Sequence, residues 1–456
     1  METVKEKVDK QRSFFLNQNT KDIKFRKRQL IILKEAIAHN EQEILLALKK
    51  DLNKSTFEGY ATEIGMVYEE IGFMLHNINR LAKSKRVRTP ITLFPAVSRI
   101  YKEPYGVVLI MSPWNYPFQL AMVPLIGAIA TGNCTMIKPS NYSSNTSAVI
   151  RKIITENFKP EYISVVEGGR EANQSLLEQK FDYIFFTGSV TIGKTVMEKA
   201  AAHLTPVTLE LGGKSPCIVD KTADIKTTAK RLAWAKYLNA GQTCVAPDYL
   251  LIHESVKEEF LKELKKNIQT MYGEKPQENE NFPKIINEKH FERLNKLIAG
   301  GKVIVGGNSN PATLQIEPTV FDQVSWSDEI MQEEIFGPIF PVITYKEIGE
   351  IVEKINSRPK PLALYLFTTS KSVEKTILGK ISFGGGCVNG AILHLATSNM
   401  PFGGVGDSGM GNYHGEASFR TLSHEKSVLK KYVGFDVPLI YPPYGNRVNL
   451  LKKIMK

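Results

Sequence analysis

The run Val107-Val108-Leu109-Ile110-Met111 decides the fold class, because five consecutive apolar residues suit a parallel strand that is covered on both faces. A helical pattern over residues 118–130 follows it and stops at Gly132. Further short apolar runs occupy residues 134–137, 162–166 and 183–186, and a helical segment over 144–158 separates the first two. Strands that alternate with helices at these lengths predict a doubly wound α/β sheet.

A second α/β unit is expected after Glu210. It begins with a strand over residues 217–219, and a helix over 222–237 leads the chain to Cys244. Further helices are expected over 255–271 and 287–297, with strands near Val303 and Leu364. A chain of 456 residues is long for one hydrophobic core, so two domains with small additions are expected.

The N-terminal part is expected to be helical. Between residues 22 and 48 the apolar residues recur mostly at intervals of three and four, and Asn40, with Glu43 three residues later, predicts the cap of a second helix. Another helix is predicted over 60–82. Residues 83–90 are basic and end in proline, which predicts a linker.

The loop Asn239-Ala-Gly-Gln-Thr-Cys-Val-Ala-Pro-Asp248 is the first candidate for chemistry. Gly241 frees the backbone and Pro247 stiffens it, which is how a chain presents the thiol of Cys244 at the tip of a loop. By residue type alone, a free cysteine is more often a small buried hydrophobic residue. Other segments are needed to decide between these interpretations.

Three motifs supply that decision: Pro113-Trp-Asn-Tyr-Pro117, Leu209-Glu-Leu-Gly-Gly-Lys214 and Glu333-Glu-Ile-Phe-Gly-Pro338. With the Cys244 loop, they stand in the same order and at the same relative distances as in the NAD(P)-dependent aldehyde dehydrogenases. The chain resembles that family over nearly its whole length. Tyr116 and the Ala-Pro-Asp after Cys244 resemble the class 3 branch, whose members handle medium to long-chain aliphatic and aromatic aldehydes.

The resemblance implies an α/β aldehyde dehydrogenase-like fold, with a Rossmann-type cofactor domain, an α/β catalytic domain and a small bridging sheet for oligomerisation. The expected cofactor domain covers residues 1–85 and 105–209, and the catalytic domain covers 210–398. Segment 399–420 returns to the active-site cleft, 86–104 and 421–440 form the bridging segments, and 441–456 is a basic C-terminal tail.

The resemblance also implies three catalytic residues. Cys244 is the nucleophile, and Glu210 is the base that removes a proton from the hydrolytic water. Asn115, with the backbone N–H of Cys244, forms the oxyanion hole. A surface carboxylate does not suit Glu210, because it belongs to an apolar strand where an idle charge is costly to bury. Without the family, Asn115 equally suits a loop turn before Pro117.

The glycine-containing turn from Thr187 to Lys194 follows a predicted strand and opens a helix, so its N–H groups and helix dipole suit a phosphate. The residues alone equally suit a plain tight turn. The expected cofactor-binding residues are Trp114, Lys138, Asn141, Gly168, Gly188, Ser189, Gly193, Glu334 and Phe336. The expected substrate pocket contains Tyr116, Phe402 and His414, although a structural role for His414 is an open alternative.

Asn141 departs from the family pattern. Most relatives that prefer NAD have glutamate after Lys-Pro-Ser/Ala, where it bonds the adenosine ribose and repels a 2′-phosphate. Here that repulsion is missing, so NADP is expected to be accepted as well as NAD. Steric exclusion of the phosphate by a neighbouring group is the alternative.

Composition limits the remaining possibilities. The four cysteines and eight histidines show no ligand spacing, so no metal is expected, and scattered cysteines favour a reducing cytoplasm. The net charge of +12 is spread over helix faces rich in both signs, so nucleic-acid binding is not expected. The start lacks a signal peptide, and no apolar run reaches the ~18 residues of a membrane span.

A homodimer that oxidises a hydrophobic aldehyde is therefore expected. One rival is an acylating or reducing relative that passes the thioester to another acceptor, and Glu210 argues against it because such enzymes generally lack that base. The other rival is a non-catalytic binding or membrane-surface protein on the same fold.

Overall fold

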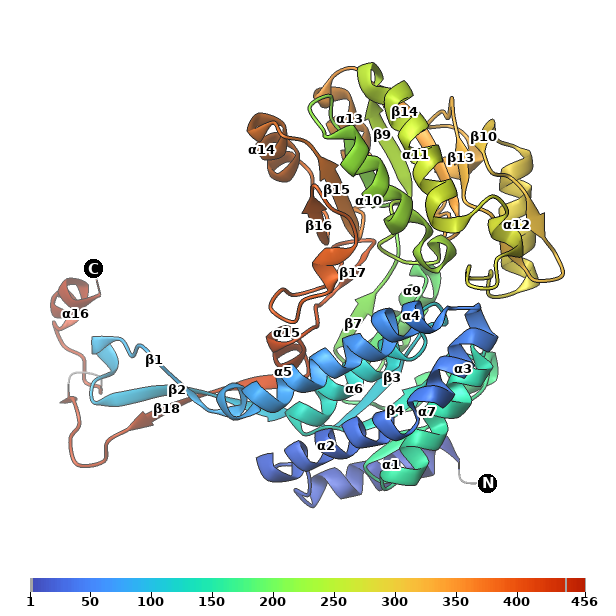
Figure 1. Ribbon diagram of the computed structural model, residues 1–456. Helices are drawn as coiled ribbons and strands as arrows, with labels where there is room; N and C mark the ends of the chain where they lie inside the picture. The colour runs from blue at the N-terminus through green and yellow to red at the C-terminus, as the bar shows by residue number, and fades with distance from the viewer. Residues whose placement is uncertain (1–2, 439–440, 456) are drawn as a thin grey trace.

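The computed structural model describes residues 3–438 and 441–455. The expected segments also reach residues 1–2, 439–440 and 456, which lie outside the described residues. Figure 1 shows a lower α/β body, an upper α/β body and a narrow arm that carries the C-terminal end. Within the described ranges, none of the helices combines the length and the apolar character that a membrane span requires.

The lower body is built on a six-stranded sheet. Its order is β17 (Gly409–Met410), β7 (Val207–Glu210), β6 (Tyr183–Thr187), β3 (Val107–Met111), β4 (Cys134–Lys138) and β5 (Ile163–Val165). Strand β17 runs antiparallel to β7, and the other neighbours pair in parallel. Every residue of β3 is buried, because helices cover both faces of the sheet. The predicted doubly wound α/β arrangement is confirmed.

The helices of this body come from the first half of the chain. They are α1 (Val4–Leu16), α2 (Ile23–His39), α3 (Glu41–Leu52), α4 (Thr56–Gly59), α5 (Gly65–Ala82), α6 (Gln119–Thr131), α7 (Ser144–Asn157), α8 (Arg170–Leu177) and α9 (Val190–Ala201). Helix α6 ends at Gly132, whose φ of 92° lies in the left-handed region that glycine favours.

The upper body is built on a seven-stranded sheet. Its order is β10 (Val303–Val305), β13 (Thr319–Phe321), β14 (Ile339–Tyr345), β9 (Tyr249–His253), β8 (Pro216–Val219), β15 (Ala363–Phe367) and β16 (Gly385–Val388). Strand β10 is antiparallel to β13, and the other neighbours pair in parallel. Its helices are α10 (Ile225–Tyr237), α11 (Lys257–Tyr272), α12 (Glu288–Ala299), α13 (Ile348–Asn356) and α14 (Lys371–Lys380). A two-stranded sheet joins β11 (Ser309–Asn310) to β12 (Gln315–Ile316).

The arm is a three-stranded antiparallel sheet of β1 (Lys85–Val87), β2 (Ala96–Pro104) and β18 (Ser423–Lys431). Helix α15 (Glu416–Thr421) leads into β18, and α16 (Val448–Ile454) lies beyond it near the arm's end. The predicted linker over 83–90 is wrong, because it contains β1. That strand is short and none of its residues is buried, so it lacks an apolar pattern.

Two details of the N-terminal helices also differ from expectation. Asn40 is the N-cap residue of α3, as predicted, but its side chain makes no capping bond and its amide donates instead to the carbonyl of Ala36 at 2.8 Å. The helix predicted over 60–82 begins with a π-helical turn, η1 (Tyr60–Ile64), before the regular α5.

The remaining short helices are 3-10 turns. They are η2 (Ile91–Leu93), η3 (Leu238–Gly241), η4 (Glu254–Val256), η5 (Pro276–Glu278), η6 (Glu329–Met331) and η7 (Leu393–Leu395). Of these, η3 is the closest to the candidate site, because it forms the start of the Cys244 loop.

Candidate active site

The Cys244 loop leaves α10 through a tight left-handed turn. Asn239, Ala240 and Gly241 have φ values of 51°, 52° and 72°. At Gly241 a side chain would also clash with the backbone carbonyl of Gly337. The turn thus brings the Cys244 loop against the Glu333–Pro338 motif and leaves Cys244 partly buried.

Asn115 lies against this loop and is only 3% exposed. Its side-chain amide donates to the carbonyl of Gln242 at 3.0 Å, and the side chain of Asn239 donates to the Asn115 carbonyl at 2.9 Å and to the Gln242 carbonyl at 3.2 Å. A carboxamide has two N–H groups, so this bond leaves Asn115 one N–H for an oxyanion.

Glu210 is the last residue of β7 and is 3% exposed. Its backbone carbonyl accepts from the N–H of Gly188 at 3.0 Å, while neither carboxyl oxygen has a hydrogen-bond partner among the described residues. Buried polar atoms usually have partners. Burial raises the pKa of Glu210 well above its usual value.

The thiol of Cys244 is protonated at neutral pH. Burial, together with the negative charges of Glu334 and Glu210, raises its pKa to about 12, while backbone N–H groups act in the opposite direction. Burial and the nearby charge of Asp248 raise the pKa of Glu334 to about 8. The three groups are therefore close enough for each carboxylate to oppose ionisation of the thiol.

Glu334 occupies space that Gly212 leaves open, because a side chain at 212 would overlap its carboxylate. The segment around Glu334 is anchored by Lys214, whose ammonium binds Asp248 at 2.5 Å and the carbonyls of Ile330 and Glu333. The Leu209–Lys214 and Glu333–Pro338 motifs thus meet at the end of the Cys244 loop.

Trp114 and Phe336 form an edge-to-face pair with ring centroids 5.3 Å apart. Trp114 belongs to the Asn115 loop and Phe336 to the Glu334 segment, so this pair joins two of the sequence motifs. The structure thus brings both predicted cofactor residues to the same side of the site as Glu334.

The remaining predicted cofactor residues line the carboxyl ends of β4, β5 and β6. Lys138 ends β4 and is 5% exposed, and its ammonium has no hydrogen bond or ion pair within the described part of the chain. Burial lowers its pKa to about 8. A lysine that is largely buried and whose ammonium has no partner among the described residues fits an anionic or hydroxyl-rich ligand such as the adenosine end of NAD(P).

The turn after β6 offers a second contact for the same ligand. Gly188 and Ser189 precede α9, and the Ser189 hydroxyl accepts from the N–H of Ile192 at 3.4 Å. Gly193 lies inside α9 and packs on Leu211. The N-terminus of this twelve-residue helix is oriented to favour a phosphate.

Asn141 and Gly168 lie on neighbouring loops at this edge of the sheet. Asn141 is exposed, and its amide nitrogen comes within 3.7 Å of where a side-chain carbon on Gly169 would stand. Gly168 has a φ of 132°, in the region that glycine favours. Two observations support the fit of these residues to NAD(P): they lie together at the carboxyl ends of β4 and β5, and the ammonium of Lys138 has no partner among the described residues.

Two of the three predicted pocket residues lie among aromatic side chains near the thiol. The Tyr116 hydroxyl and the Thr243 hydroxyl are 2.7 Å apart, directly before Cys244. Phe402 forms a backbone bridge with Tyr413, with ring centroids 5.7 Å apart. Both predicted residues are buried, so they present little free surface in this state.

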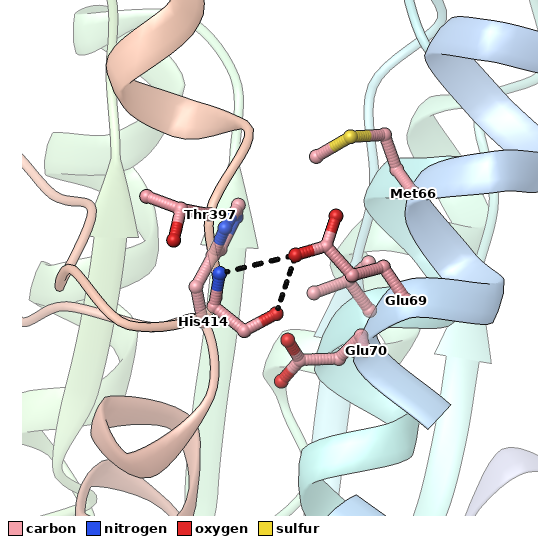
Figure 2. A pocket seen from close by; sticks show the side chains of 7 residues that line it. Met66, Glu69, Glu70, Thr397 and His414 are labelled. Carbon is pink, nitrogen blue, oxygen red and sulfur yellow. Dashed lines mark hydrogen bonds between the residues drawn. The ribbon is translucent and has the colours of Figure 1, made fainter. Parts of the chain in front are cut away.

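His414 faces α5 instead. Figure 2 shows it beside Glu69 and Glu70, at a cavity of about 10 Å³ that is large enough for one water molecule. Burial lowers the pKa of His414 to about 4, and its Nε2 atom has no partner among the described residues. A pocket role for His414 stays a prediction.

Tyr413 is a residue that the sequence analysis missed. It is 2% exposed, and burial and the charges of Glu210, Cys244 and Glu70 raise its pKa well above the usual value. Its ring lies next to Phe402 and Phe185. It stands in a glycine-rich segment that predicts only a loop, so no local signal marks it.

Comparison with known proteins identifies the family of the chain. The aldehyde dehydrogenase family profile matches residues 1–428. A 4,4'-diaponeurosporen-aldehyde dehydrogenase of Staphylococcus aureus is 47% identical over the whole of both chains. The mouse aldehyde dehydrogenase family 3 member B1 is 44% identical, over 98% of this chain and 96% of its own.

Solved structures of aldehyde dehydrogenases superpose closely on this chain. The substrate-bound state of Staphylococcus aureus AldH superposes with a TM-score of 0.98 at 47% identity, covering 100% of both chains. An indole-3-acetaldehyde dehydrogenase of P. syringae, solved as a mutant in complex with NAD+ and IAA, gives 0.86 at 26% identity, covering 94% of this chain and 88% of its own.

The chain therefore belongs to the aldehyde dehydrogenase family. It is an NAD(P)-dependent aldehyde dehydrogenase that oxidises aldehydes to carboxylic acids. The rival interpretation as a non-catalytic binding protein is excluded by this similarity to enzymes over nearly the full chain.

The mutual charge effect of Glu334 and Cys244 predicts a pH-dependent thiol reactivity. Above the Glu334 pKa of about 8, its negative charge raises the thiol pKa, so Glu334→Gln should increase the thiolate fraction. At pH 9 we expect alkylation of Cys244 by iodoacetamide to be about five-fold faster, which corresponds to ~1 kcal/mol of charge interaction.

At pH 6.5 the two proteins should react alike, because Glu334 is protonated in the parent as well. Both measurements use the Cys387→Ser background, since Cys387 is the other partly buried thiol among the described residues. Equal rates at pH 9 would show that Glu334 does not act on the thiol.

Proposed function

We propose that Cys244 is the nucleophile, Glu210 the general base and Asn115 the oxyanion donor of the aldehyde oxidation. The observation that carries this assignment is the carboxyl group of Glu210, which is buried without a partner in the described part of the chain and interacts electrostatically with Cys244. Burying a carboxyl group without a hydrogen-bond partner lowers the stability of the folded chain, so such a group calls for a functional explanation. A general base needs a carboxyl oxygen that no other hydrogen bond occupies, and Glu210 provides one.

The first half of the reaction forms a bond between sulfur and carbon. The Cys244 thiolate adds to the carbonyl carbon of the aldehyde, and the carbonyl oxygen becomes an oxyanion. The remaining side-chain N–H of Asn115 and the backbone N–H of Cys244 donate to that oxygen. Because the thiol is protonated in the free enzyme, a base must accept its proton, and Glu210 is the nearby candidate.

Bound NAD(P)+ supplies the hydride acceptor that the oxidation requires. Lys138, Asn141, Gly168 and the turn of Gly188, Ser189 and Gly193 would hold its adenosine and phosphate end, while Trp114, Glu334 and Phe336 would hold the nicotinamide end. The unpaired ammonium of Lys138 supports the first group, and the contact between Trp114 and Phe336 supports the second.

The second half of the reaction is hydrolysis of the Cys244 thioester. Once the proton taken from the thiol has passed to solvent, Glu210 removes a proton from water. The resulting hydroxide adds to the thioester carbon, and the carbon–sulfur bond breaks to release the carboxylic acid and the Cys244 thiolate. An acylating relative would pass the thioester to another acceptor and would not need this base. The buried Glu210 therefore favours hydrolysis.

We propose that the substrates are medium to long-chain aliphatic or aromatic aldehydes. Aromatic side chains gather around the thiol: Tyr413 interacts electrostatically with Cys244, and the hydroxyl of Tyr365 donates to the carbonyl of Val245 at 2.5 Å. A relative that is 47% identical is named for 4,4'-diaponeurosporen-aldehyde. Apolar walls favour substrates in proportion to the apolar area that they bury.

A homologous series of aldehydes tests the substrate class. We expect kcat/KM to rise by roughly three-fold or more per added methylene between propanal and decanal, because each buried methylene contributes about 0.8 kcal/mol. Benzaldehyde should be accepted. A flat profile, or a preference for acetaldehyde, would contradict the proposal while leaving the catalytic assignment intact.

We further propose a cytoplasmic homodimer. All four cysteines are free, and the arm exposes Phe94, Tyr432, Val433 and Phe435 around a hollow of about 440 Å³. Exposed apolar clusters of this kind mark interaction sites. Sedimentation at twice the chain mass of 51.1 kDa would support the dimer, and cell fractionation tests the compartment.

Glu210→Gln should separate the two halves of the reaction. If hydrolysis needs the base, an initial burst of NADH is followed by a steady rate at least tenfold lower, since general bases contribute roughly 10²–10⁴-fold. If Glu210 also deprotonates the thiol, the burst shrinks as well. Cys244→Ala serves as the control and should abolish both phases while NAD binding, measured by fluorescence, is retained.

Asn141→Glu should selectively damage the use of NADP. Two unit charges about 4 Å apart interact by roughly 4 kcal/mol at an effective dielectric near 20, so a new carboxylate beside a 2′-phosphate weakens its binding strongly. We expect the parent to use both cofactors and the variant to lose NADP binding, measured as a dissociation constant. A parent preference for NAD above about a thousandfold would show that Asn141 is not the determinant.

A further inference from the structure

Three charged side chains lie under the Asn115 loop, and the catalytic assignment does not use them. Lys54 and Glu63 are 1% and 0% exposed, and Glu58 is partly buried beside them. Lys54 binds Glu63 at 2.6 Å. Burying ions costs free energy that one ion pair rarely recovers, so such a cluster is weak evidence for a purely stabilising role.

Glu63 caps the helix that follows the oxyanion loop. Its second carboxylate oxygen accepts from the backbone N–H groups of Phe118 and Gln119 at 3.1 and 2.9 Å. Helix α6 has no side-chain cap from its own N-cap residue, Phe118. Glu63 thus takes that place from another element and fixes the backbone three residues after Asn115.

Lys54 and Glu58 extend the contact to both sides of the site. The Lys54 ammonium lies 3.9 Å from the centroid of the Tyr116 ring, and the Tyr116 hydroxyl meets Thr243. Glu58 accepts from the backbone N–H of Asn239 at 2.9 Å, and Asn239 in turn bonds to the Asn115 carbonyl. The cluster therefore touches the oxyanion loop and the Cys244 loop together.

Glu63 belongs to an irregular helical turn. Residues Tyr60–Ile64 form the π-helical turn between α4 and α5, closed by the N–H of Gly65 donating to the carbonyl of Tyr60. A π turn adds a residue and so changes the direction in which the following side chains point. Glu63 lies in this turn, four residues before the buried Val67, and is itself fully buried.

We propose that Lys54, Glu58 and Glu63 are positioning residues that hold the oxyanion donor Asn115 in register with Cys244. The proposal rests on the proposed catalytic roles of those two residues. Donors contribute to the rate only where the oxyanion develops, and a misplacement of about 1 Å can cost roughly 10²-fold. The cluster acts through backbone and ring contacts and does not touch the substrate.

Glu63→Gln is the direct test. Glutamine has nearly the same shape but no negative charge and only one acceptor oxygen, so it cannot bind both the ammonium of Lys54 and the two backbone N–H groups. We expect kcat to fall by roughly 10- to 100-fold, with the aldehyde KM and the NAD dissociation constant changed by less than about three-fold. Glu58→Gln should have a smaller effect in the same direction. If Glu63→Gln does not fold, Glu58→Gln carries the test.

A double-mutant cycle with Asn115→Ala separates positioning from general stability. If the cluster acts through Asn115, Glu63→Gln or Glu58→Gln should change kcat by less than about three-fold in the Asn115→Ala background. Full additivity would overturn the inference. If Asn115→Ala leaves kcat unchanged, the proposed role of Asn115 as oxyanion donor is contradicted. That outcome differs from full additivity, which contradicts only the positioning role of the cluster.

Asp182→Asn is a matched control. Asp182 also pairs with a cation, Arg12, and accepts from the backbone N–H of Val107 at 2.8 Å. It directly precedes β6, however, at the amino ends of the parallel strands and thus away from the site. We expect it to lower the thermal midpoint while kcat stays within about two-fold. Normal kcat in the folded Glu63→Gln and Glu58→Gln proteins would also overturn the proposal.

Discussion

The contacts at the carbonyl oxygen of Gln242 hold the two halves of the site together. Asn115 comes from the loop after β3 of the six-stranded sheet, and Asn239 and Gln242 come from the turn after α10 of the upper body. Both asparagine side chains donate to that one oxygen. Because the acceptor lies two residues before Cys244, these bonds set the distance between the proposed oxyanion donor and the thiol more directly than either sheet does.

Parallel strand order explains why residues far apart in sequence meet at this point. Lys138, Thr187 and Glu210 are the last residues of β4, β6 and β7, whose carboxyl ends share one edge. A single backbone hydrogen bond, from the N–H of Gly188 to the carbonyl of Glu210, joins the proposed cofactor turn to the proposed base. The proposed cofactor turn and the proposed base therefore lie at the ends of two neighbouring strands, β6 and β7.

The sequence predicts the buried strands well, because parallel strands covered on both faces are continuous apolar runs, as in Val107–Met111. It does not predict β1, whose three residues are Lys, Arg and Val at a sheet edge. Nor does it predict the burial of Lys54 and Glu63, since charged residues in a helical pattern indicate a solvated face. The proposed catalytic and cofactor residues follow only from the resemblance, and Tyr413 carries no local signal at all.

Gly212 and Gly241 both leave space in the site, but different neighbours occupy that space. An added methyl at Gly241 would meet the fixed backbone of Gly337, so the chain would lose stability. At Gly212 it would meet only the flexible end of Glu334, which can move aside. Alanine at 212 would therefore leave the fold in place and displace one carboxylate, whereas alanine at 241 would disturb the backbone that the fold requires.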